Sequence, residues 1–89
     1  MPRVEVRPWV ITDLSNALTR STLGRVLFDL HNHLPNNLAL YQPKRIPKSV
    51  QCFSYSRIYS ESNKLHGLEF VVRDADPAIL EVIWVVHTA

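Results

Sequence analysis

The chain has 89 residues, a length that predicts a single domain over residues 1–89. Hydrophobic residues make up 46% of it, which excludes a disordered polypeptide, and no apolar run approaches the roughly 20 residues that a membrane helix needs. The formal net charge is +2, an excess so slight that the placement of the basic residues matters more than their number.

Cysteine usage and the first residues favour one cellular compartment. Cys52 is the only cysteine in the sequence, so no internal disulfide can form, and this fits a reducing cytoplasm. The stretch 1–9 is charged and alternating, unlike the continuous apolar block of a secretory signal. We therefore expect a cytoplasmic protein without a membrane segment.

The first part of the chain predicts a strand and a short helix. Apolar and polar residues alternate over Arg3–Val10, which is typical of a strand. Pro8 cannot donate a ladder hydrogen bond, so this strand lies at an edge or ends there. Thr12 or Asp13 can then cap a short helix that continues through Leu18.

A second, stronger helix is predicted to follow, with Ser21 as its cap and Pro35 as its stop. Its apolar residues follow the spacing of one helix face. They are Leu23, Val26, Leu27, Leu30 and Leu34. Two short helices joined by a tight link predict a helical hairpin.

The second half of the chain predicts strands. After a loop over Asn36–Ser49, period-two patterns indicate strands at Val50–Tyr59 and Leu65–Arg73. The last strand, Ile79–His87, is largely apolar on both faces, which is typical of a strand in the middle of a sheet. The expected fold class is α+β: an N-terminal strand, two short helices and a three-stranded antiparallel meander.

Several local features carry a resemblance to a known family. A basic residue stands in the second strand at Ser56–Ile58, Leu68–Val72 has a leucine-x-aromatic pattern, and the final core strand Ile79–His87 ends in a histidine. With the order of elements from Val4 to His87, these features resemble the RelE/ParE toxin superfamily, in particular its YoeB- and HigB-like members.

The resemblance implies a fold, an activity and partners. The fold would place two helices on one face of an antiparallel sheet. The activity would be ribosome-dependent mRNA cleavage that arrests translation, with neither metal nor cofactor. Such cleavage needs a base for the 2′-hydroxyl, cations for the phosphate and an acid for the leaving oxygen. The partners would be RNA on the ribosome and a cognate antitoxin that covers the basic face of the toxin.

Two residues are the candidate catalytic groups. His87 ends a core strand, and an ordinary pKa near 6.5 suits an imidazole for proton transfer at neutral pH. Arg57 stands among Tyr55, Tyr59 and Phe53. A cation flanked by aromatic rings can hold a phosphate while the rings stack on unpaired bases, so Tyr55 and Tyr59 are candidate RNA-binding residues.

Further candidate RNA contacts lie outside this strand. Lys44, Arg45 and Lys48 form an acid-free basic cluster that could hold RNA backbone. In the family, an arginine often precedes the leucine of the third strand; here Gly67 stands in that position and His66 precedes it. His66 is therefore a candidate substitute for the missing arginine.

Other classes of site are not supported. His31 and His33 are two residues apart and do not share a helix face, so we expect no joint metal site. Gly24 and Gly67 are the only glycines, so no glycine-rich phosphate loop is present.

The protein could be a degenerate toxin, because the third strand has no arginine before its leucine and no aromatic residue follows His87. Two functions of other classes also remain open. The first is a non-enzymatic module that binds RNA or a protein through the same aromatic face. The second is a homodimeric structural protein that associates through its apolar C-terminal strand.

Overall fold

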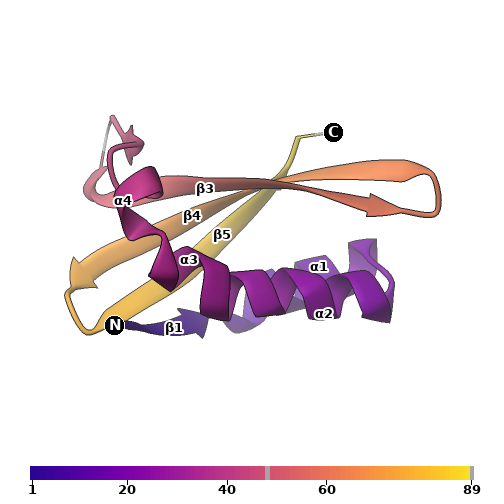
Figure 1. Ribbon diagram of the computed structural model, residues 1–89, viewed down its shortest axis with the longest axis horizontal. Coiled ribbons are helices and arrows are strands. Elements are labelled where there is room, and N and C mark those ends of the chain that lie inside the picture. Colours follow the sequence, from indigo (N-terminus) through magenta and orange to yellow (C-terminus); the bar gives the residue numbers. More distant parts are fainter. Residues whose placement is uncertain (48, 89) are drawn as a thin grey trace.

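The computed structural model describes residues 1–47 and 49–88 and has an α+β fold. The strands are β1 (Arg3–Val6), β2 (Arg45–Ile46), β3 (Ser49–Glu61), β4 (Lys64–Asp76) and β5 (Ile79–His87). The helical segments are α1 (Pro8–Ala17), α2 (Arg20–Phe28), the π-helical turn η1 (Asp29–His33), α3 (Leu34–Asn36) and α4 (Leu38–Tyr41). Figure 1 shows α1 and α2 beneath the long strands β3 and β4.

The five strands form one mixed sheet in the order β1-β5-β4-β3-β2. β3, β4 and β5 are antiparallel neighbours, whereas β1 lies parallel to β5. The β3–β4 register is continuous, and its turn consists of Ser62 and Asn63, whose φ angles of 49° and 65° suit a two-residue hairpin turn. The predicted bounds of the last strand, Ile79–His87, and its position inside the sheet are both confirmed.

The N-terminal strand is shorter than predicted, and the first helix is longer. β1 ends at Val6, and Pro8 begins α1 instead of continuing the strand. Proline suits the first turn of a helix because its fixed φ is helical and its missing N–H would have no helical partner there. The predicted cap at Thr12 or Asp13 is therefore wrong, since both residues lie inside α1.

The second helix also differs from its predicted bounds. Its cap is Thr19 rather than Ser21, and the Thr19 side chain accepts a hydrogen bond from the Thr22 N–H. The helical path does not stop at Pro35 but runs from α2 through η1 and α3 to Asn36. In η1 the Leu34 N–H donates to the Asp29 carbonyl five residues back, and this wider turn accommodates a proline that would clash in a regular helix.

The predicted loop Asn36–Ser49 contains short regular elements. α4 forms one turn within it, and β2 pairs with the first part of β3, where Arg45 lies opposite Phe53. Lys48 lies outside the described residues. No helix in the described part of the chain is long and apolar enough to cross a membrane.

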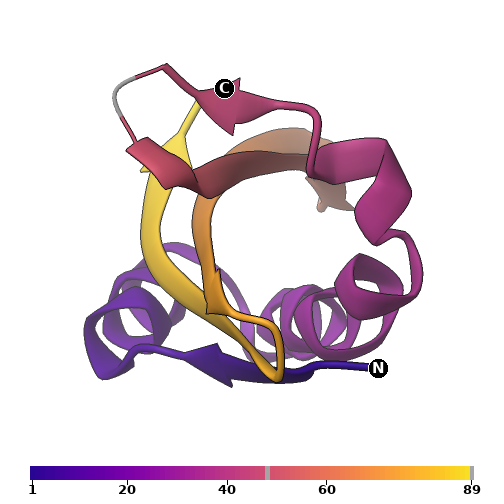
Figure 2. The ribbon, with the colours of Figure 1, turned by 90° about the vertical axis from the view of Figure 1, so that its left-hand side faces the viewer.

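The core lies between the helices and the concave face of the sheet, and Figure 2 shows the strands curving around α2, α3 and α4, with α1 beside β5. On β3 the alternate residues Phe53, Tyr55 and Tyr59 face this core and are almost fully buried. Arg57 has the same parity and therefore shares their face. Its charged side chain is nevertheless 34% exposed, and this partly exposed cation on the core-facing side of β3 places the candidate site.

Candidate functional site

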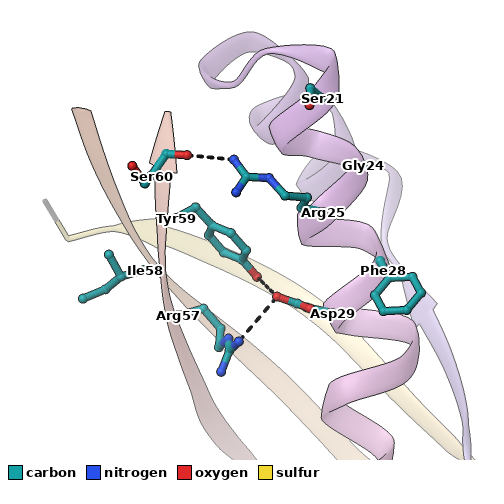
Figure 3. A pocket seen from close by; sticks show the side chains of 9 residues that line it. All are labelled: Ser21, Gly24, Arg25, Phe28, Asp29, Arg57, Ile58, Tyr59 and Ser60. Atoms are coloured by element: carbon teal, nitrogen blue, oxygen red, sulfur yellow. Dashed lines mark hydrogen bonds and ion pairs between the residues drawn. The ribbon is translucent and has the colours of Figure 1, made fainter. Parts of the chain in front are cut away.

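A hollow of about 590 Å³ separates α2 from the outer end of β3 (Figure 3). Its helical side is formed by Ser21, Gly24, Arg25, Phe28 and Asp29, and its strand side by Arg57, Ile58, Tyr59 and Ser60. We call this feature the α2–β3 hollow. It brings one predicted catalytic residue, Arg57, and one predicted RNA-binding residue, Tyr59, to a single place.

Asp29 connects these two β3 residues to the helix. The Tyr59 hydroxyl donates to Asp29 Oδ2 over 2.8 Å, and Arg57 Nη2 lies 3.6 Å from the same oxygen. Burial, followed by the hydrogen bond to Asp29, raises the pKa of the Tyr59 phenol well above its usual range, so the phenol keeps its proton and donates a hydrogen bond to the carboxylate. Arg57 keeps 34% of its side chain exposed, so its guanidinium remains accessible from the hollow.

A second guanidinium lies on the helical side of the hollow. Arg25 Nη2 donates to the carbonyl oxygen of Ser60 over 2.7 Å and to Thr22 Oγ1 over 3.2 Å. Beside it, a Cβ atom added at Gly24 would meet no atom within 4 Å. The α2–β3 hollow therefore offers two cations and open space between them.

Behind Arg57 lies a polar group that the sequence did not reveal. The π-helical turn places His33 Nε2 3.0 Å from the Tyr41 hydroxyl and 3.4 Å from Arg57 Nη1. The Asn37 side-chain amide donates to the His33 carbonyl over 2.7 Å and fixes the end of the helix. Asp29, Arg25 and His33 join the site through contacts distant in sequence, so no spacing signal could have identified them.

Tyr55 lies deeper than its predicted role in base stacking requires. It is 0% exposed, and its ring packs edge-on against Tyr41 with 4.7 Å between centroids. Its hydroxyl is buried without a hydrogen-bond partner among the described residues. Tyr59 is 6% exposed, so both rings belong to the core in this structure, and neither presents an open face to a base.

His87 lies on the same sheet face as Arg57 but in different surroundings. The strand register places Arg57, Leu68 and His87 in one row across β3, β4 and β5. The backbones of β3 and β5 are therefore roughly 10 Å apart at this row. Leu68 separates them and is 1% exposed. His87 Nε2 lies 2.6 Å from Asp13 Oδ1 of α1. The two predicted catalytic residues thus pair with different carboxylates and do not touch each other.

The remaining predicted RNA contacts are dispersed. Arg45 makes a bidentate pair with Asp74, at 2.6 and 2.8 Å, which holds the pKa of that carboxyl below its usual range. Lys44 is exposed, with its Nζ 5.7 Å from the centre of the Tyr41 ring. His66 is buried, with Nε2 3.4 Å from Glu61 Oε1.

Within the described residues, no group of three or more histidine, cysteine, aspartate or glutamate side chains could hold a metal ion. No protein-family model matches the sequence, and neither a curated protein nor a solved structure matches it significantly. The geometry of the chain itself therefore carries the functional argument.

Proposed function

We propose that this protein is a RelE/ParE-like toxin that binds RNA and cleaves mRNA on the ribosome. The observation that carries the proposal is the α2–β3 hollow, where Arg57 and Arg25 face an open space. The carboxylate beside them, that of Asp29, already accepts a hydrogen bond from Tyr59. Guanidinium groups bind phosphate through paired N–H donors, and a hollow with two of them suits the backbone of a single strand.

The order of elements supports the same proposal. A first strand, two main helical segments and three consecutive antiparallel strands follow one another, and the first strand lies beside the last. The resemblance implies an antiparallel sheet with two helices on one face, and the α+β element order supports the proposal to that extent, whereas the parallel β1 and the additional strand β2 are not part of what it implies. The helical part is longer than the resemblance implied, because it continues through the π-helical turn and α4.

In the proposed reaction, the 2′-hydroxyl of one nucleotide gives its proton to a base as its oxygen attacks the adjacent phosphorus. The P–O5′ bond breaks, a 2′,3′-cyclic phosphate forms, and the departing 5′-oxygen takes up a proton. Arg57 and Arg25 would neutralise the charge that develops on the phosphate. His87, oriented by Asp13, is the proposed proton-transfer group. His33 is the alternative candidate for that role, because it lies 3.4 Å from Arg57.

Induced expression in bacteria tests the proposal, with growth arrest as the readout at matched protein levels. We expect arrest by the wild type and relief by Arg57→Ala, whereas Arg73→Ala, an exposed arginine of β4 outside the hollow, should behave like the wild type. Relief by His87→Ala but not by His33→Ala would assign proton transfer to His87, and the reverse pattern would assign it to His33. No arrest by the folded wild-type protein would refute the toxin proposal.

A binding module without catalysis is the second candidate function. The separation of Arg57 from His87 by the buried Leu68 favours it, because a cleaving site must bring its cation and its proton carrier to one phosphate. This candidate predicts that Arg57→Ala weakens RNA binding while His87→Ala changes nothing.

The proposed partners are RNA on the ribosome and an antitoxin protein that covers the basic hollow. Homodimer formation through the C-terminal strand would rely on the side chains of β5, since β4 occupies one backbone edge of this strand and β1 occupies the first part of the other, over Ile79–Val82. Trp84 and Val86 are the exposed apolar groups that it offers, at 57% and 41%. Sedimentation over a range of concentrations would detect such a dimer.

A further inference from the structure

The outer end of β3 is an open sheet edge. β2 pairs with β3 only near its start, and among the described residues the last backbone–backbone hydrogen bond on that side runs from the Ser54 N–H to the Lys44 carbonyl over 3.1 Å. Beyond Ser54, β3 continues to Glu61 paired with β4 on one side and, in the described part of the chain, with no strand on the other side. Exposed edges of this kind present unpaired backbone donors and acceptors to any extended chain.

The direction of the free backbone groups follows from the same bond. Backbone groups alternate along an antiparallel strand, so Ser56, Ile58 and Ser60 point outward as Ser54 does. The Ser60 carbonyl confirms this parity, because it accepts from Arg25 across the hollow. The N–H and C=O groups of Ser56 and Ile58 therefore form a short, regular docking edge that Arg25 closes at one end.

This edge carries one usual protection, the inward-facing charge of Arg57, but lacks others. The β3–β4 register runs without a bulge from Cys52 to Glu61, and the segment carries neither proline nor lysine. Ile58 on the edge is 73% exposed, and Phe28 across the hollow is 66% exposed. Gly24 meets nothing within 4 Å, although a glycine inside a helix is less favourable than an alanine. Space, apolar surface and unpaired backbone thus coincide at one place.

We propose that the β3 edge at Ser56–Ile58 accepts an extended segment of a partner protein as a sixth strand, lying in the α2–β3 hollow. Side chains of the added strand alternate between the two faces of the sheet. Those on the concave side meet Arg57 and Arg25, and those on the convex side meet Ile58. The occupant is therefore a strand with acidic side chains alternating with apolar ones.

Charge argues against a second copy of this chain as the occupant. Two β3 edges paired with each other would bring the arginines of one hollow against those of the other, and like charges directly opposite in a sheet are destabilising. The inference goes beyond the proposed function, because strand addition requires no catalysis and would occur in a protein without RNA-cleaving activity.

Amide hydrogen exchange, measured by NMR on the full chain, tests the inference directly. In the free protein the amides of Ser56 and Ile58 should exchange fast, whereas those of Tyr55 and Arg57, which face β4, should be protected. Addition of a capped peptide of alternating glutamate and valine should slow exchange at Ser56 and Ile58 alone. The same peptide N-methylated at alternate residues cannot donate, and we expect it to bind at least about tenfold more weakly.

Two variants and one peptide separate the contributions. Gly24→Leu should fill the hollow and abolish peptide binding, and Arg57→Gln should weaken it about tenfold, with urea unfolding confirming that both variants fold. A lysine–valine peptide should bind more weakly than the glutamate–valine one. Ser56 and Ile58 amides protected without peptide at high protein concentration would identify a second copy as the occupant and overturn the inference.

Three other results would also overturn it. These are equal binding of the N-methylated peptide, no binding at millimolar concentration of the glutamate–valine peptide, and protection of the two amides by oligouridylate but not by peptide. None of these binding experiments uses growth arrest as its readout. A refuted toxin proposal would therefore not change their outcomes.

Discussion

Replacing Gly24 by alanine should make this protein more stable. Gly24 is the fifth residue of α2 and lies well inside the continuous helical path to Asn36. Alanine is favoured over glycine inside a helix by about 0.8–1.0 kcal/mol, because glycine loses more backbone freedom on folding. The added methyl group meets no atom within 4 Å, so no steric cost opposes this gain.

We therefore expect the free energy of unfolding to rise by about 0.5–1 kcal/mol, which corresponds to a melting temperature roughly 3–6 °C higher for a domain of this size. Urea unfolding followed by tryptophan fluorescence measures the first quantity and calorimetry the second, and the urea m value should stay unchanged. Ser15→Ala, at an exposed position of α1, is the matched control and should gain about 0.5 kcal/mol from the same preference.

A loss of stability in Gly24→Ala would refute the reasoning, because it would mean that the space beside Gly24 is not open in solution. A gain in stability combined with weaker binding of peptide or RNA would show that the glycine keeps the α2–β3 hollow accessible to a ligand. Selection for function often leaves such stabilising substitutions unused.

Further stability predictions follow from the polar groups of three side chains, Tyr55, Tyr59 and Glu61. Tyr55→Phe should be neutral or stabilise the protein by up to about 1 kcal/mol, because it removes a buried hydroxyl that has no partner among the described residues. Tyr59→Phe should destabilise the protein by about 1–2 kcal/mol, because it removes the hydrogen bond to Asp29. Urea unfolding curves of the two variants check both predictions. Hydrogen bonding from Thr22 and Thr19 lowers the pKa of Glu61 from 4.5 to about 2, so its stabilisation is complete above pH 4.5 and is lost as the pH falls towards 2. The difference in unfolding free energy between wild type and Glu61→Gln should therefore shrink over that pH range, and a constant difference would contradict this account.

The strands were predictable because their pattern is local. Alternation along β3 and β4 and the two apolar faces of β5 follow from which side chains must face the core. The helix bounds predicted from Pro8 and Pro35 were wrong. Proline interrupts a helix only where its missing N–H removes a hydrogen bond or its ring clashes with the preceding turn. Neither applies to Pro8 at the helix start, and at Pro35 the wider η1 turn removes the clash.

The candidate site was only partly predictable, because the fold decides which side chains meet. Arg57 stood out as a cation within an aromatic strand face, and the structure places it on the hollow. Asp29 and Arg25 looked like ordinary helix surface, and only the position of α2 opposite β3 brings them to Arg57. His87 was plausible as a strand-terminal histidine, yet its pairing with Asp13 depends on where α1 packs.

The parallel pairing of β1 with β5 constrains how the chain can fold during synthesis. Arg3 aligns with Ile79 and Val6 with Val82, so the first strand emerges from the ribosome long before its only neighbour exists. The hairpin of β3 and β4 can form early through its two-residue turn, whereas closure by β1 must wait for the last strand. Such long-range pairing slows folding, because the entropy of closing a long loop is lost before the contacts form. Until then the edge of β5 that β1 covers in the folded protein is open as well, in addition to the open edge along β3.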